Sequence, residues 1–96
     1  MRYEARCELW LYAGKAAWHF LTLPAELTAG LKAMAPGASP WGSVRVRASI
    51  GKASWSTSLF PDSSSGAFLL PVKADVRRRE KLSAGDTVDV AVELVL

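Results

Sequence analysis

The chain contains very little of the two side chains on which thiol and most metal chemistry depends. Its 96 residues include one cysteine, Cys7, and one histidine, His19. A single cysteine cannot form an internal disulfide, which is typical of a reducing compartment, and we expect a cytoplasmic location. No spacing of metal-ligating residues, phosphate-binding glycine loop or nucleophile elbow is present, so the sequence predicts no metal site, cofactor or catalytic residue.

Long apolar stretches are also absent. The apolar runs are far shorter than the ~20 residues of a membrane-spanning helix, and the N-terminal stretch MRYEARCELW lacks the apolar segment of a signal peptide. We therefore expect no membrane partner. Half of the residues are nevertheless hydrophobic, which argues against disorder. A chain of this length is expected to form one domain, residues 1–96, around one modest core.

The excess of positive charge is small. Lysine and arginine total 12 against 9 acidic residues, which gives a net charge of +3. This balance permits an anionic partner without requiring one. The densest positive charge is the run Arg77-Arg78-Arg79, with Lys81 close behind it.

Alternation of apolar and polar residues predicts most of the strands. Residues 2–13 alternate, Gly14-Lys15 has the glycine-first pattern of a type II′ turn, and residues 16–23 continue as a second strand. A second hairpin spans residues 43–60 around Gly51-Lys52. Its register follows from the turn, because a slip of one residue would bury Arg45 and Arg47. The predicted inward pairs are Val44 with Leu59, Val46 with Thr57, Ala48 with Trp55 and Ile50 with Ala53.

Two prolines each mark the end of a strand and the predicted first residue of a helix. Pro24 precedes Leu27, Leu31 and Met34 at helical spacing, and Pro71 precedes Val72 and Val76. A short strand over 68–70 and a last alternating strand over 87–96 complete the elements, while residues 36–40 form a loop.

The order strand, strand, helix, strand therefore occurs twice, in residues 1–51 and 52–96. The predicted fold is mostly β: a six-stranded double-split β-barrel with two short helices and internally duplicated β-β-α-β halves. Because one chain carries both halves, it need not dimerise to fold, and a monomer suffices.

Three motifs carry a family resemblance: W-x-T-S-L-F-P over 55–61, L-P-V-K-A-x-V-R over 70–77 and G-D-x-V-x-V over 85–90. Residues 70–90 resemble the swapped-hairpin unit of the AbrB, MazE and MraZ group. The whole chain resembles an uncharacterised bacterial family, the domain of unknown function numbered nineteen-oh-five. That resemblance implies a double-split barrel, with no established activity and no known catalytic residues.

Lys73 and Arg77 are the main candidates for a site. If the helix begins at Pro71, Lys73 lies in its first turn, where free N–H groups attract anions, and Arg77 follows one turn later. Arg78, together with Arg45 and Arg47 on the serine-lined face of the hairpin, extends the candidate anion or nucleic-acid surface. The alternatives are a solvated basic face, or a lysine paired with a nearby aspartate.

The four tryptophans invite a stacking interpretation, but three have ordinary explanations. Trp55 faces Ala48 in the core, Trp18 lies in an apolar strand, and Trp41 closes one end of the barrel. Trp10, on the polar face of the first strand, is a candidate protein contact with Tyr12, or is covered by a helix. In the predicted first hairpin Trp10 lies opposite His19 and Thr22 opposite Cys7, so Cys7 and His19 form no catalytic pair.

The leading hypothesis is a small non-enzymatic binding module for an anionic or nucleic-acid partner. One alternative is a protein–protein interaction module that docks through Trp10, Tyr12 and a sheet edge. Another is a small enzyme or anionic-metabolite binder that uses a pocket at Lys73. Binding to nucleic acid would weaken steeply with salt, whereas protein docking would weaken much less.

Overall fold

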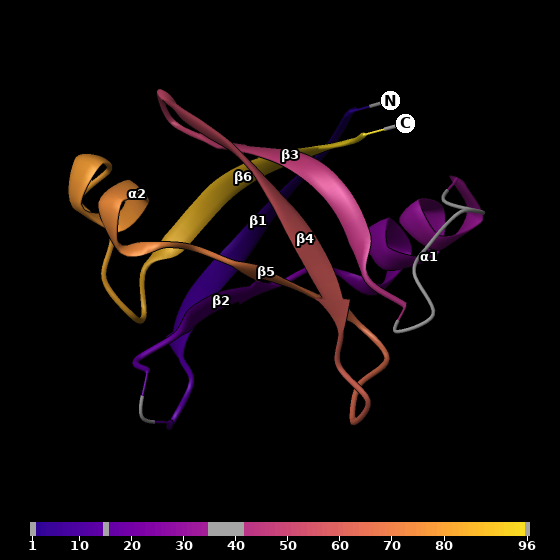
Figure 1. The fold of residues 1–96 in the computed structure, drawn as a ribbon, viewed down its shortest axis with the longest axis horizontal. Helices are drawn as coiled ribbons and strands as arrows, with labels where there is room; N and C mark the ends of the chain where they lie inside the picture. The colour runs from indigo at the N-terminus through magenta and orange to yellow at the C-terminus, as the bar shows by residue number, and fades with distance from the viewer. Residues whose placement is uncertain (1, 15, 35–41, 96) are drawn as a thin grey trace.

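The computed structural model describes residues 2–14, 16–34 and 42–95, and Figure 1 shows their arrangement. The prediction for the loop at 36–40 and for Trp41 lies outside these residues. In chain order the elements are β1 (Arg2–Leu11), β2 (His19–Thr22), α1 (Ala25–Met34), β3 (Val44–Ile50), β4 (Ala53–Pro61), β5 (Phe68–Pro71), α2 (Ala74–Arg79) and β6 (Thr87–Leu94).

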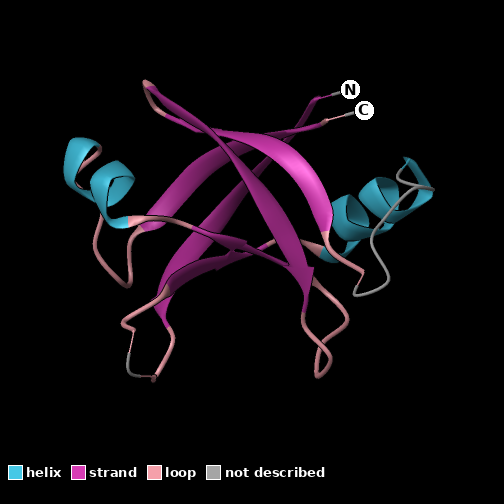
Figure 2. Ribbon diagram, viewed as in Figure 1, coloured by secondary structure: helices cyan, strands magenta, loops and turns pink. Residues whose placement is uncertain are grey.

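The six strands close into one antiparallel barrel in the order β1-β2-β5-β4-β3-β6. β1 pairs with β6 along its first part and with β2 at its end, and β4 passes in the same way from β3 to β5. The helices flank the barrel on opposite sides (Figure 2). The predicted six-stranded, mostly β barrel with two helices is confirmed. Docking of a partner protein at a sheet edge, one of the alternatives from the sequence, stays a prediction.

The pattern of strand pairing is unchanged when the two halves are exchanged. β1, β2 and β3 then take the places of β4, β5 and β6, and every pair of neighbours maps onto another pair of neighbours. Neighbours β2 and β5, and neighbours β3 and β6, map onto themselves. This pattern agrees with an approximate twofold relation between the halves, while their origin by duplication stays a prediction.

The core consists of the inward-facing residues of the strands and the apolar sides of the two helices. α1 contributes the buried Leu27 and Leu31, and α2 contributes Val76. Thr28 is the one buried polar residue in the described chain, and its Oγ1 accepts a hydrogen bond from the Phe68 N–H at 3.3 Å. The largest fully buried side chains are Phe68, Leu9, Leu21, Leu23, Leu31, Leu59, Leu70, Val46 and Val92.

The predicted register of the β3–β4 hairpin is confirmed, from Val44 opposite Leu59 to Ile50 opposite Ala53. Gly51 has a positive φ of 57° and Lys52 does not have a positive φ, which is the pattern of a type II′ turn. The side chains of β3 therefore alternate between the core and the outer face.

The predicted register of the first hairpin is wrong by one residue. Trp10 lies opposite Phe20, not His19, because the Tyr12 N–H donates to the Trp18 carbonyl at 2.8 Å and the connection is longer than a two-residue turn. Cys7 accordingly pairs with Val88 of β6 rather than with Thr22. Exposed alanines at 16 and 17 belong to this connection, and not to a strand.

The prediction that Pro71 begins a helix is also wrong. Pro71 is the last residue of β5 and lies opposite Phe20, and the next residue, Val72, donates its N–H to the His19 carbonyl at 2.9 Å. Lys73 has an extended backbone (ψ 160°) and is the N-cap of the six-residue α2, without a capping side-chain bond. Neither α1 nor α2, the helices of the described chain, has the length and apolar character needed to cross a membrane.

Candidate functional site

A cleft of about 530 Å³ lies on the outside of the barrel, where α2 follows β5. Its walls come from the connection before β2, from β3 and β4, and from the segment leading into α2. Both halves of the chain therefore contribute to it. The lining residues are Ala16, Ala17, Trp18, His19, Arg45, Trp55, Ser56, Thr57, Ser58, Phe60, Pro71, Val72, Lys73, Ala74 and Arg77.

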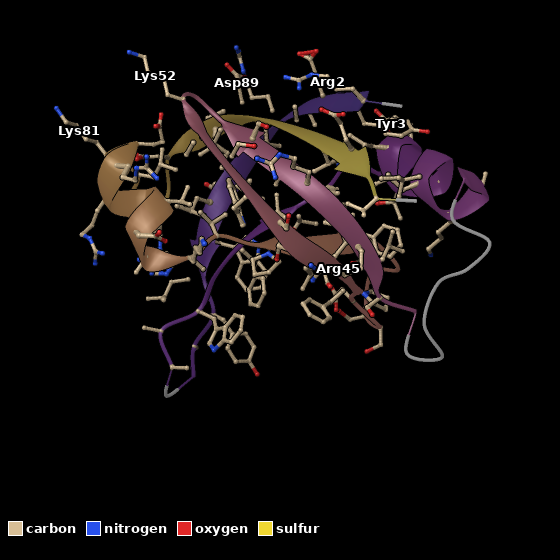
Figure 3. The ribbon with its side chains drawn as sticks, turned by 45° about the horizontal axis from the view of Figure 1, so that its top comes forward. Arg2, Tyr3, Arg45, Lys52, Lys81 and Asp89 are labelled. Atoms are coloured by element: carbon tan, nitrogen blue, oxygen red, sulfur yellow. The ribbon has the colours of Figure 1, made fainter. Side chains whose placement is uncertain are left out.

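Three cationic side chains from separate elements meet at this cleft: Arg45 of β3, Lys73 before α2, and Arg77 within α2. The alternation of β3 turns Arg45 outward, and its Nη1 donates to Ser58 Oγ at 3.2 Å. In Figure 3, Arg45 lies over the barrel wall, whereas Lys52 and Lys81 extend from the periphery of the molecule. The predicted association of Arg45 with the Lys73–Arg77 segment therefore has a physical basis in the fold.

Arg77 is half-buried and held by two contacts. Its Nε donates to the Val72 carbonyl at 3.2 Å, and its Nη1 lies 3.4 Å from His19 Nε2. His19 Nδ1 is 2.9 Å from the Ala17 carbonyl, which can only accept a hydrogen bond. These contacts are satisfied together by a neutral imidazole with its proton on Nδ1, so that Nε2 accepts from Arg77. Within the described chain, the remaining N–H groups of the guanidinium donate no hydrogen bond to a protein group.

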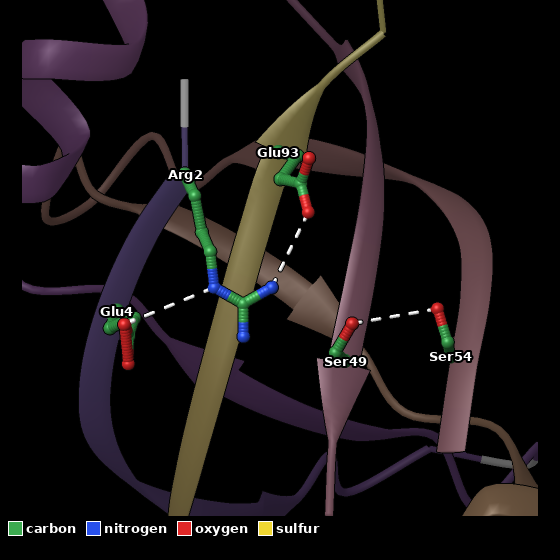
Figure 4. A network of polar contacts seen from close by, with 5 residues as sticks. All are labelled: Arg2, Glu4, Ser49, Ser54 and Glu93. Atoms are coloured by element: carbon green, nitrogen blue, oxygen red, sulfur yellow. Dashed lines mark hydrogen bonds and ion pairs between the residues drawn. The ribbon is translucent and has the colours of Figure 1, made fainter. Parts of the chain in front are cut away.

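Two arginines elsewhere on the barrel, Arg2 and Arg6, are paired with carboxylates. On the outer face of β1 and β6, Arg2 contacts Glu93 at 3.4 Å and Glu4 at 3.9 Å, as Figure 4 shows. Arg6 contacts Asp89 at 2.8 Å, which raises the pKa of the Arg6 guanidinium and lowers that of the Asp89 carboxyl.

The cations of the cleft differ from those of this outer face. Within the described part of the chain, no carboxylate lies within ion-pairing distance of Arg45, Lys73 or Arg77. In the described chain, Lys73 therefore forms no ion pair with an aspartate. Asp75 instead accepts a hydrogen bond from the Val76 N–H, and Asp86 accepts one from the Ser83 N–H. The cleft carries uncompensated positive charge beside the hydroxyl groups of β4.

An aromatic cluster continues from the cleft onto the outer face of β1 and β2. Trp18 stacks on Phe20 with ring centroids 5.9 Å apart and an interplanar angle of 17°, and half of its surface is exposed. The prediction that Trp18 lies in an apolar strand is therefore wrong, because β2 begins only at His19. Trp10 is half-buried, 5.3 Å from Phe20, and its Nε1 donates to Thr22 Oγ1 at 2.9 Å. Trp55 is buried opposite Ala48, as predicted.

The other predicted site residues lie outside the cleft. Arg47 is exposed on β3, in register with Ser56 on one side and Glu93 on the other, and Arg78 is exposed on α2. Tyr12 is 53% exposed at the edge of the aromatic cluster, 6.2 Å from Phe20. The structure thus brings together Lys73, Arg77 and Arg45.

Sequence reasoning missed the contribution of the segment before β2 to this site. Trp18 and His19 fall within the predicted strand over residues 16–23, and the sequence gives no signal that links either residue to Lys73. The signal that could have found them is the pair Ala16-Ala17, whose small side chains suit a connection better than the interior of a strand.

Cys7 and His19 are separate, as predicted. Cys7 is a free, buried thiol opposite Val88, and burial raises its pKa. His19 is half-buried at the cleft and contacts Arg77 instead. In the described ranges, no group of three or more potential metal ligands is placed to hold an ion.

A smaller cleft of about 240 Å³ lies at the corresponding elements of the other half, between the connection before β5 and the start of α1. Its one cation, Lys32, donates to the Gly66 carbonyl at 3.2 Å and lies 5.6 Å from the Phe68 ring centroid. Glu26 holds the place, two residues after the proline, that Lys73 holds in the second half. The features suited to an anion are therefore concentrated on one side of the barrel.

Comparison with known proteins adds one result to this geometry. Curated proteins provide no match to the chain. A family model described as "Domain of unknown function (DUF1905)" matches residues 6–92, which include all six strands in whole or in part. The chain with this closed barrel and cationic cleft therefore belongs to the DUF1905 family.

Proposed function

We propose that the protein is a small non-enzymatic binding module whose cleft holds an anionic ligand. The observation that carries this proposal is the meeting of Arg45, Lys73 and Arg77 in one cleft, without a carboxylate partner among the described residues. Charge-assisted hydrogen bonds from such groups are the strong ones in anion recognition. The hydroxyl groups of Ser56 and Thr57 add neutral donors beside the charge.

The shape of the site favours a small anion, or one unit of a larger polyanion, over a broad charged surface. The cleft volume lies within the range of about 300 to 1,000 Å³ that is typical of ligand sites. Arg47 and Arg78 do not extend the cleft, so the continuous basic face expected of a duplex reader is not supported. The free thiol of Cys7 fits a reducing compartment, and we place the protein in the bacterial cytoplasm.

Isothermal titration calorimetry with inorganic pyrophosphate tests the proposal. Lys73→Glu and Arg45→Glu should each weaken binding at least tenfold, because each replaces attraction by repulsion inside the cleft. Lys52→Glu is the matched control, since it makes the same change of charge at an exposed turn that does not line the cleft. No pyrophosphate binding at low salt, or equal weakening by all three substitutions, would overturn the proposal.

Protein docking is a second candidate function, favoured by the exposure of Leu11 and Tyr12 beside Trp10. Leu11 and Tyr12 are 51% and 53% exposed, although both are large apolar-bodied side chains. Cross-linking of the purified protein into cell extract provides the test. A product that persists at high salt, disappears in Tyr12→Ser and survives in Lys73→Glu would favour docking over anion binding.

A further inference from the structure

The cleft combines its positive charge with aromatic side chains from two separate parts of the barrel. Trp18 precedes β2, Phe60 lies near the end of β4, and β5 separates these strands in the barrel. Trp18 and Phe60 are 50% and 45% exposed, and both line the cleft. An inorganic anion cannot stack on an aromatic ring, so the exposed rings in the walls of the cleft indicate a ligand that has a flat ring in addition to its charge.

Trp18 is held in place before any ligand arrives. Its ring stacks on Phe20, which in turn packs against Trp10, and the Trp10 indole is fixed by its hydrogen bond to Thr22. A supported ring loses little conformational entropy on binding, which favours stacking of a planar group on its open surface. The next residue, His19, positions Arg77, so the aromatic platform and the cation are coupled through adjacent residues.

We propose that the ligand is a nucleotide unit, either free or within a single strand. Its base stacks on Trp18, its phosphate is bound by Arg77, the phosphates next to it are bound by Lys73 and Arg45, and the hydroxyl groups of β4 hydrogen-bond to its sugar. This inference rests on the proposed anion-binding function and names its ligand class. Bases in a duplex are stacked on one another, so a cleft of this kind selects a free or unpaired nucleotide.

Two ligands with the same charged group test the inference: inorganic pyrophosphate and ADP. Calorimetry on the wild-type chain should show that ADP binds more tightly than pyrophosphate. Trp18→Ala should weaken ADP binding by about 5- to 150-fold, the range for one stacked base, and should leave pyrophosphate binding unchanged. Tyr12→Ala is the matched control, because Tyr12 contacts the same Phe20 ring and does not line the cleft.

The outcomes separate this inference from the proposed function. Equal affinities for ADP and pyrophosphate, or equal weakening of both by Trp18→Ala, would overturn the nucleotide assignment and leave anion binding intact. If neither ADP nor pyrophosphate binds, both the nucleotide assignment and the proposed anion binding are overturned. A short oligothymidine strand is the third probe: tighter binding than ADP assigns the site to single strands, and weaker binding assigns it to free nucleotides. Circular dichroism checks that Trp18→Ala is folded.

Discussion

The salt dependence of single-strand binding can be estimated from the three cations of the cleft. Each phosphate that a protein neutralises on a single strand contributes about −0.7 to the slope of log affinity against log salt. If Arg45, Lys73 and Arg77 meet one phosphate each, the slope is about −2. Affinity for oligothymidine should then fall about 16-fold between 50 and 200 mM salt.

Neutral substitutions test this estimate residue by residue. Lys73→Gln should reduce the slope by about 0.7, and Lys73→Gln with Arg45→Gln by about 1.4, because each removes one counterion-releasing contact. Fluorescence anisotropy of a labelled strand at five salt concentrations provides the measurement, and Lys52→Gln is the control. A slope near zero would refute the cationic cleft. A slope steeper than about −4 would show that cations outside it, Arg47 and Arg78 among them, also bind phosphates.

Three further predictions concern stability. Gly51→Ala should lower the free energy of unfolding in urea by about 1–3 kcal/mol, because φ 57° strains an L-residue. A Cβ at this position would also overlap the Glu80 carboxylate. If the loss of stability vanished in a Glu80→Ala background, the contact with Glu80 alone would explain it. Bonds from two serine hydroxyls lower the pKa of Asp62, so its stabilisation should be present above the ordinary aspartate pKa and be lost as pH falls through the lowered value. Asp62→Asn should remove this acid-dependent loss in urea midpoints. Burial raises the pKa of Cys7, so stability should fall as pH rises through the ordinary thiol pKa, and Cys7→Ala should flatten that alkaline decline.

The β3–β4 hairpin was predictable because two independent signals agree there. Gly51 fixes the turn, and alternation places Arg45 and Arg47 outside, so only one register satisfies both. Gly14 gives the same local signal before β2, but apolar side chains follow it on both faces, and alternation no longer selects a register. Trp18 then resembles a core residue, although it stacks on the outside of the sheet.

The cleft could be predicted only in part. Lys73 and Arg77 are close in sequence, so the sequence predicts them together as site residues. The helix nevertheless begins after Lys73, because pairing with β2 keeps Pro71 in a strand. The contact of Arg77 with His19 joins residues 58 positions apart. Such a contact depends on how the barrel closes, which local patterns in the sequence do not determine.

The division of the cleft between the halves has a consequence for assembly. Trp18, His19 and Arg45 belong to residues 1–51, whereas Lys73 and Arg77 belong to residues 52–96. Neither half alone can build the site, so a ligand binds only where the halves have come together and stabilises that state by mass action. Two separate peptides, cut at the β3–β4 turn, should therefore associate more tightly in the presence of ligand, which would act as a clasp between them.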